Sequence, residues 1–266
     1  MRSGRSLPAV LIVFLLAAAP LAAAQQKLIA LTFDDGPRPY VLLGVPSPPE
    51  KASPSLLDLL DRDHVKATFF VVGWRLTKNS QGAREEPKLG VTCLVAAKEI
   101  VRRGHELENH TFSHLNLQKQ EKHEGLPWVL DDVEKESRLL ETLTGKRPHF
   151  VRPPDWLLSE EARRQLQARG YQVMTIYADA PPALRDVNSL DYLCTGTNPR
   201  HCPKPSLAES VVRTIAEREK RGVTTHILAF HELSSTVKAL ETLIPELEAR
   251  GYRFVTLSEY MQAVRH

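Results

Sequence analysis

Short apolar runs alternate regularly along this chain with longer amphipathic segments. The amphipathic segments, such as "TCLVAAKEIVRRG" and "SLAESVVRTIAEREKRG", have helical periodicity and end in basic residues followed by Gly. Seven apolar runs have the composition of β-strands: residues 27–33, 67–72, 105–109, 149–151, 171–177, 226–230 and 252–257. Repeated strand–helix units of this kind predict a parallel sheet covered by helices.

This alternation predicts an α/β protein of one domain, folded as a distorted or incomplete (β/α) barrel of about seven parallel strands. An open doubly wound sheet is the alternative, but no Gly-rich phosphate-binding loop follows the first strand. The Pro-containing segment 180–205 interrupts the alternation and is expected to be a surface loop. In barrels of this kind catalytic residues lie where strands end, so polar residues at the strand ends are the candidates.

Residues 1–24 are expected to be a secretory signal peptide. Arg2 and Arg5 precede an apolar run that is short for a membrane span, and small residues precede a cleavage point. An uncleaved membrane anchor is the alternative. The interpretation makes residues 25–266 the folded domain, predicts a secreted or periplasmic protein, and leaves no membrane span after cleavage.

The charge of the chain argues against a nucleic-acid partner. Of the 35 basic residues two lie in the leader, which holds none of the 32 acidic residues, so the domain itself is close to neutral. Nucleic-acid binding requires a basic patch or stripe.

The three cysteines leave one question open. Cys194 and Cys202 either form a disulfide across a Pro-containing loop or remain thiols. Cys93 is expected to be a small buried residue.

Two adjacent carboxylates stand at the end of the first strand, in "LIALTFDDGPRPY". Asp34 and Asp35 are like charges that repel each other unless another group makes the arrangement useful. The Gly36-Pro37 turn can direct both side chains into the mouth of a barrel instead of to opposite faces of the strand. The pair therefore predicts a site with partners elsewhere in the chain.

Two histidines follow the third strand, in "ENHTFSHLNL". His110 and His114 are four residues apart, and on a helical turn such side chains share one face. Two imidazoles and one carboxylate form an open site for a divalent metal ion, with positions left for water and substrate. One aspartate can then bind the ion while its neighbour remains free to accept a proton.

Two further strand ends carry groups that fit this chemistry. Arg152, in "HFVRPPDW", can orient a free carboxylate and keep it ionised. His231, in "HILAFHEL", can protonate a leaving group from the other side of the mouth. Each residue type alone is more often structural, and their common position at strand ends makes them candidates.

The ordered set "TFDDGP", "HTFSH", "RPPDW" and "FHE" resembles the motif series of the polysaccharide deacetylase family, carbohydrate esterase family 4. The resemblance extends from about Lys27 to the C-terminus and includes "KATFFVVG" between the first two motifs. It implies a distorted (β/α) barrel and metal-dependent hydrolysis of N-acetyl, sometimes O-acetyl, groups on glycans. Residues 25–266 are then a polysaccharide deacetylase catalytic domain that releases acetate.

The resemblance also assigns roles to matching residues. The catalytic residues that it implies are Asp34 as general base, Arg152 as partner of the base, His231 as general acid and Asp179, in "IYADAPP", as tether of that histidine. The metal ligands that it implies are Asp35, His110 and His114. The substrate-binding residues that it implies are Pro154, Asp155 and Trp156, with a backbone N–H of the same loop near the oxyanion.

The sequence departs from the family pattern at two of these motifs. The third motif has Asp155-Trp156 where the family has an aromatic residue followed by Gly. In the fourth, the family has a second aspartate and a Trp soon after the first. Here two prolines follow Asp179, and the next aspartates are Asp186 and Asp191.

The implied cofactor is a divalent metal ion, with Zn²⁺ as the default and Co²⁺ or Ni²⁺ as alternatives. The implied partner is an acetylated glycan, with N-acetylglucosamine polymers first. Two other functions share the residues. A non-haem iron oxygenase uses the same ligand set, but typically on a jelly-roll of β-strands. A non-catalytic glycan-binding protein on the same fold is the second, and the intact Asp and His set argues against it.

Overall fold

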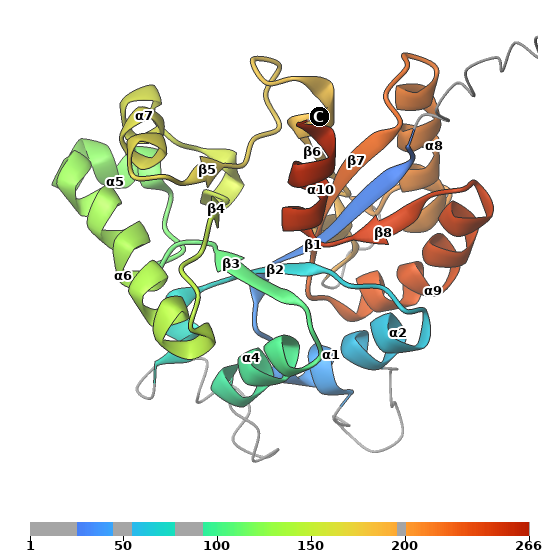
Figure 1. The fold of residues 1–266 in the computed structure, drawn as a ribbon, viewed down its shortest axis with the longest axis horizontal. Helices are drawn as coiled ribbons and strands as arrows, with labels where there is room; N and C mark the ends of the chain where they lie inside the picture. Colours follow the sequence, from blue (N-terminus) through green and yellow to red (C-terminus); the bar gives the residue numbers. More distant parts are fainter. Residues whose placement is uncertain (1–25, 45–54, 78–92, 196–200, 266) are drawn as a thin grey trace, which may run out of the picture.

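The computed structural model describes residues 26–44, 55–77, 93–195 and 201–265 (Figure 1). The predicted signal peptide, residues 1–24, lies outside these ranges. Within them, no helix combines the length and the apolar composition that crossing a bilayer requires.

The described strands form one curved parallel sheet, which confirms the expected α/β distorted barrel. Seven strands follow one another in the order β5-β4-β3-β2-β1-β7-β6, and β8 pairs with β1. One isolated parallel bridge, between Thr175 and Arg185, links the two ends of this order. The strands are β1 (Leu28–Gly36), β2 (Thr68–Val71), β3 (Glu106–Asn109), β4 (Phe150–Val151), β5 (Gln172–Val173), β6 (Asp186–Asn188), β7 (Thr225–His231) and β8 (Arg253–Val255).

Strand β6 lies in segment 180–205, which the sequence predicted as a surface loop, and that prediction is wrong. β6 pairs in parallel with β7 along its three residues. Two short 3₁₀ helices flank it, η4 (Pro182–Leu184) and η5 (Asp191–Cys194). A strand this short and polar shows no apolar alternation, so the pattern could not reveal it. The segment forms a wall of the barrel.

Helices cover the outside of the sheet. They are α1 (Pro39–Leu43), α2 (Leu56–Arg62), α4 (Cys93–Arg102), α5 (Leu117–Glu124), α6 (Leu126–Thr144), α7 (Glu160–Ala168), α8 (Leu207–Glu219), α9 (Ser234–Ala249) and α10 (Leu257–Val264). In Figure 1, α5 to α7 lie beyond β3 to β5, and α8 and α9 lie on the side of β7. Ser55, Asn116, Ser159, Ser206 and Thr256 each cap a helix by accepting a backbone N–H, which fixes where these helices begin.

Strand β1 is the central strand, and its side chains alternate between two cores. Ile29, Leu31 and Phe33 belong to the large cluster between the sheet and the outer helices. Leu28 and Ala30 belong to a second cluster inside the barrel. An apolar run buried on both faces is what a central parallel strand requires.

The interior of the barrel is apolar at one end and polar at the other. Leu257, Tyr260 and Met261 of α10 pack with Phe70 and Phe150 in the inner cluster. Helix α10, red in Figure 1, thereby fills the half of the interior that the N-terminal residues of β1 line. The polar groups occupy the opposite half, where the parallel strands end.

Candidate metal centre and active site

The two adjacent aspartates of β1 both reach the mouth of the barrel. Asp34 is the last inward-facing residue of the strand and pairs in register with His231 of β7. Between Phe33 and Gly36 the pairing of β1 with β2 shifts register, and Asp35 adopts a left-handed φ of 67°. This irregularity, together with the turn that follows, brings both carboxylates to one side.

The turn after Asp35 is packed against a buried acid from the end of β7. A Cβ on Gly36 would lie 1.8 Å from Oε1 of Glu232, so any other residue there would have to displace that side chain. Oε2 of Glu232 accepts the backbone N–H of Arg38 at 2.5 Å. Burial raises the pKa of Glu232 to about 8, so this side chain supports the turn mainly as a neutral acid at pH 7.

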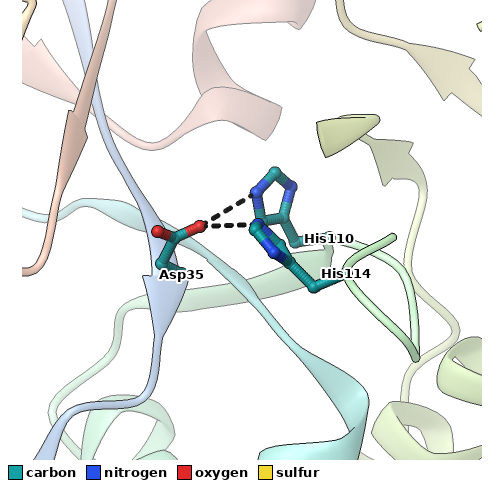
Figure 2. A group of neighbouring side chains, drawn as sticks. All are labelled: Asp35, His110 and His114. Carbon is teal, nitrogen blue, oxygen red and sulfur yellow. Dashed lines mark ion pairs between the residues drawn. The ribbon is translucent and has the colours of Figure 1, made fainter. Parts of the chain in front are cut away.

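Asp35, His110 and His114 converge on one point, as Figure 2 shows. Oδ1 of Asp35 lies 2.9 Å from Nε2 of His114 and 3.4 Å from Nε2 of His110. The three potential ligand atoms all lie within 4.8 Å of one another. Two imidazole nitrogens and one carboxylate oxygen at this spacing suit a divalent ion and leave coordination positions open.

The two histidines do not share a face of a helical turn, and that part of the prediction is wrong. They lie in an irregular loop between β3 and α5, in which Thr111 and His114 have left-handed φ values of 72° and 55°. Asn109 holds the loop by accepting the N–H of Thr111, whose hydroxyl accepts the N–H of His114. The loop therefore brings the histidines together without helical geometry.

The ring of His110 is fixed by its second nitrogen. Nδ1 lies 2.6 Å from the carbonyl oxygen of Arg152, which makes Nδ1 the donor and leaves Nε2 to face Asp35. Burial would lower the pKa of His110, but the charges of Asp34 and Asp35 raise it instead. A cation at this point relieves the same negative field, so the donor set and its surroundings both fit a metal ion.

Arg152 is completely buried inside the barrel and bonds two carboxylates. Its Nη1 donates to Oδ1 of Asp34 at 2.6 Å and to Thr32 at 2.9 Å. Its Nε and Nη2 donate to the two oxygens of Asp186, each at 2.9 Å. The guanidinium also lies 4.1 Å from the centre of the Phe70 ring. The arginine therefore orients Asp34, as the sequence predicted.

His231 is held by Asp191, and this corrects the sequence-based assignment of Asp179. Asp191 accepts from Nδ1 and from the backbone N–H of His231, both at 2.7 Å, and from the hydroxyl of Thr236. Burial would lower the pKa of His231, but Asp191 raises it to about 9 with help from the charges of the neighbouring aspartates. Asp179 is exposed and lies outside this network.

The contacts of two aspartates in this site were therefore not predicted from the sequence. Asp191 carried a usable signal, because an aromatic residue, Tyr192, follows it as a Trp follows the second aspartate of the family motif. Asp186 carried none, since its partner Arg152 is 34 residues away in the chain. Asp186 also accepts the indole N–H of Trp156 at 2.6 Å.

These groups line one cavity of about 350 Å³. The lining residues are Asp34, Asp35, His110, His114, Pro153, Asp155, Trp156, Ile176, Asn188, Tyr192 and His231. Of the residues predicted to bind substrate, Asp155 and Trp156 line the cavity, whereas Pro154 is buried beside it. The rings of Tyr192 and His231 are nearly perpendicular to each other, with 5.6 Å between their centres.

Comparison with known proteins decides the family. The sequence profile named polysaccharide deacetylase matches residues 22–174, more than half of the chain. The chain belongs to the polysaccharide deacetylase family. A peptidoglycan-N-acetylglucosamine deacetylase of Bacillus cereus is 30% identical over 241 residues, which cover 89% of each protein.

Solved structures of the family share the fold. One peptidoglycan N-acetylglucosamine deacetylase superposes with a TM-score of 0.60 at 25% identity, covering 89% of this chain and 88% of its own. A CE4 family pseudoenzyme from Bacillus anthracis superposes with a TM-score of 0.62 at 23% identity, covering 89% of this chain and 66% of its own. Because a pseudoenzyme has this fold too, activity in a polysaccharide deacetylase depends on the side chains of the site.

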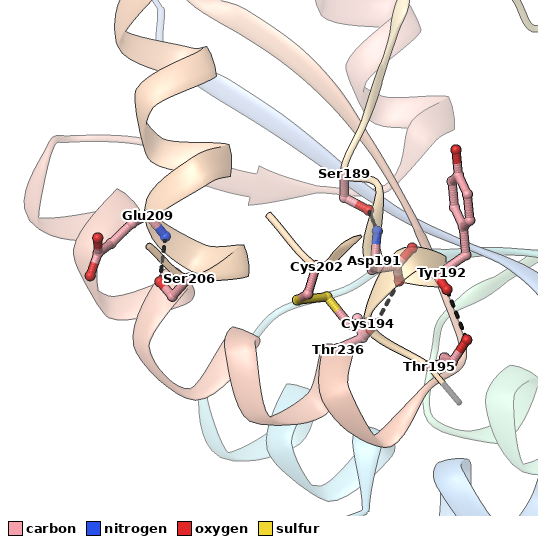
Figure 3. Close-up of a disulfide and its surroundings, with 9 residues drawn as sticks. All are labelled: Ser189, Asp191, Tyr192, Cys194, Thr195, Cys202, Ser206, Glu209 and Thr236. Atoms are coloured by element: carbon pink, nitrogen blue, oxygen red, sulfur yellow. Dashed lines mark hydrogen bonds between the residues drawn. A yellow bond between two sulfur atoms is a disulfide. The ribbon is translucent and has the colours of Figure 1, made fainter. Parts of the chain in front are cut away.

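In this polysaccharide deacetylase the segment that carries Asp191 is anchored by a disulfide (Figure 3). Cys194, at the end of η5, is bonded to Cys202, which decides between the two states that the sequence left open. Cys93 is buried, as expected. The disulfide lies three residues after Asp191, so it restrains the wall from which that carboxylate reaches His231.

Replacing both Cys194 and Cys202 with Ser is expected to lower the free energy of unfolding by about 2–3 kcal/mol, the loop-closure entropy for cysteines this close in sequence. Denaturant titration of the oxidised protein and the double variant measures the difference. Wild-type protein treated with a thiol reductant should match the variant. Equal midpoints for all three would mean that the crosslink adds nothing to stability.

Proposed function

We propose that this protein is a metal-dependent hydrolase that removes acetyl groups from an N-acetylated glycan and releases acetate. The observation that carries the proposal is one cavity that holds the Asp35, His110 and His114 ligand set, a second carboxylate and a charged histidine. The second carboxylate and the charged histidine are the proton acceptor and the proton donor that hydrolysis requires. The Bacillus cereus relative, named for N-acetylglucosamine deacetylation, supports the substrate class.

Asp35, His110 and His114 would hold the ion, with Zn²⁺ proposed first and Co²⁺ or Ni²⁺ as alternatives. When bound, a divalent ion of this kind polarises an acetyl carbonyl and acidifies a water molecule. The same ligand set suits iron in oxygenases, but those enzymes use a different scaffold, and membership of a hydrolase family favours hydrolysis.

Asp34 would be the general base. Arg152 occupies Oδ1, and no hydrogen bond from the described residues reaches Oδ2. This oxygen is therefore available to take a proton from the attacking water. The hydrogen bond from the guanidinium fixes the orientation of the carboxylate.

The backbone of the third motif offers one donor for the oxyanion. Pro153 and Pro154 have no N–H, and the N–H groups of Trp156 and Leu157 donate to the carbonyls of those two prolines. The N–H of Asp155 has no acceptor within the described part of the chain. We therefore assign it to the oxygen on which negative charge develops.

His231 would be the general acid. Its Nδ1 is bound to Asp191, so Nε2 is the nitrogen that remains for the cavity. A pKa of about 9 keeps the ring protonated at neutral pH. His231 can then give a proton to the departing nitrogen as the C–N bond breaks, which leaves acetate and a free amine.

The substrate would be a polymer that contains N-acetylglucosamine, with O-acetylated glycan as the alternative ester substrate. Asp155 and Trp156 would contact the sugar, and Pro154 would hold their loop. Residues 1–24 support a secreted or periplasmic protein with residues 25–266 as the catalytic domain. We expect no nucleic-acid partner.

A non-catalytic glycan-binding protein is the second candidate, because a pseudoenzyme shares this fold. Acetate release separates the two. Purified residues 25–266 are treated with a chelator, offered N-acetylglucosamine oligomers or peptidoglycan, and assayed again after Zn²⁺ is added. We expect the chelator to remove activity and Zn²⁺ to restore it. Ion binding without acetate from either glycan would contradict the proposed substrate, and absence of ion binding would favour the second candidate.

A further inference from the structure

Asp155 is the one exposed residue in a stretch that is otherwise buried or half-buried, from Val151 to Leu158. Its backbone has a left-handed φ of 56°, and that of Trp156 is 55°. Aspartate tolerates this conformation better than most residues. The turn exposes the Asp155 side chain on the wall of the catalytic cavity.

Among the described residues, no cation lies beside the carboxylate of Asp155. No ion pair or side-chain hydrogen bond to it is found among the described residues. Every other carboxylate at the mouth has a partner: Asp34 and Asp186 have Arg152, Asp191 has His231, and Asp35 has the two histidines and the position of the ion.

The cations of the site pair with its other four carboxylates. Arg152 bonds Asp34 and Asp186, His231 bonds Asp191, and Arg38 lies 3.6 Å from Asp35 beside the proposed position of the ion. None of these pairs includes Asp155, so no neighbour among the described residues compensates its negative charge. Its own backbone N–H is the donor assigned to the developing oxyanion, so the side chain places like charge close to that oxygen. This arrangement opposes the reaction unless the substrate brings a positive charge.

Deacetylation itself creates such a charge. Hydrolysis of an N-acetylglucosamine unit leaves a primary amine, which is protonated at neutral pH. A glycan that has lost one acetyl group therefore presents an ammonium on the same chain as its remaining acetamido groups. No other part of a neutral N-acetylated glycan offers a cation to this carboxylate.

We infer that Asp155 is a specificity-determining residue that binds the ammonium of a glucosamine unit next to the acetamido group under attack. The inference rests on the proposed function. It makes partly deacetylated glycan the preferred substrate, so that one deacetylation favours the next along the same chain. An ammonium held there neutralises the charge beside the oxyanion in the same step.

The test compares kcat/KM for two N-acetylglucosamine oligomers of equal length, one fully acetylated and one partly deacetylated. At low ionic strength the wild-type enzyme should prefer the partly deacetylated oligomer by roughly tenfold, as expected for one charged hydrogen bond. Asp155→Asn keeps the backbone N–H and the tolerance for this φ. It should lose the preference, with a higher kcat/KM for the neutral oligomer and a lower one for the charged oligomer. Salt should weaken the wild-type preference.

Glu160→Gln is the matched control, because Glu160 begins α7 a few residues further on, is exposed and does not line the cavity. It removes one negative charge and should keep the preference. The inference is overturned if the wild-type enzyme treats both oligomers alike, or if Asp155→Asn raises both values together. Absence of acetate from either oligomer with either protein would instead count against the proposed function.

Discussion

Replacing Asp34 with Asn is expected to lower kcat by about 1,000-fold while the protein still binds its divalent ion. The amide oxygen of Asn can accept from Arg152 as Oδ1 does now at 2.6 Å, so the geometry should survive. What disappears is the basic oxygen that faces the cavity. Acetate release and calorimetric titration with Zn²⁺, made on the same preparation, measure the two properties separately.

Asp35→Ala is the counterpart of that variant, because it should lose the ion and, as a consequence, its activity. It removes one of three ligands, so the affinity for the ion should fall by at least about 100-fold and activity should fall with it. High Zn²⁺ should restore part of the activity of Asp35→Ala and none of that of Asp34→Asn. Equal ion binding by the two variants would show that the division of labour between these carboxylates is assigned wrongly.

Asp191→Asn is expected to move the alkaline limb of the kcat profile to lower pH by at least about one unit. Asp191 raises the pKa of His231 to about 9 against the effect of burial. Without that charge the ring loses its proton nearer to neutrality. The rate at pH 8 should therefore fall by at least about twofold, and the rate near pH 6 should fall much less. A pH series of kcat for both proteins measures the shift.

Asp179→Asn is the matched control for this experiment. Asp179 is exposed and was the partner that the sequence favoured, so its variant should keep the wild-type pH profile. If Asp179→Asn moved the limb and Asp191→Asn did not, the network seen here would be wrong.

The same ion pair predicts how stability depends on pH. The folded-state pKa of His231 lies above the ordinary value of 6.5. The contribution to folding is therefore complete below about pH 6.5 and is lost as pH rises toward 9. Melting temperatures of the wild type should show this loss in that window, and those of Asp191→Asn should show less of it.

The residues that sequence could predict are those whose signals are local. The strand–helix alternation predicts the barrel. The ends of the apolar runs predict the site residues Asp34, Asp35, Arg152 and His231, because each of them lies where such a run stops. A parallel sheet brings such ends together whatever the loops between them do.

What sequence could not predict depends on distant contacts or on irregular backbone. Asp191 bonds a histidine 40 residues away, and neither residue marks the other in the chain. The left-handed residues of the loop from His110 to His114 lie in a segment without periodicity. The short strand β6 is recognisable only by its pairing with β7.

Arg152 also has a consequence for how a protein like this one could lose its activity in evolution. Among the described residues, the main-chain pairing between the β5 end and the β6 end of the sheet consists of one isolated bridge. The guanidinium of Arg152 adds a second link, because it pairs with Asp186 of β6 and with Asp34 of β1 across the interior. A variant without Arg152 would leave two buried carboxylates unpaired and weaken that wall. An inactivating substitution at His114, whose side chain is 37% exposed, would destabilise the fold less. A descendant that has stopped acting on glycans should therefore still carry this arginine, kept by the demands of folding alone.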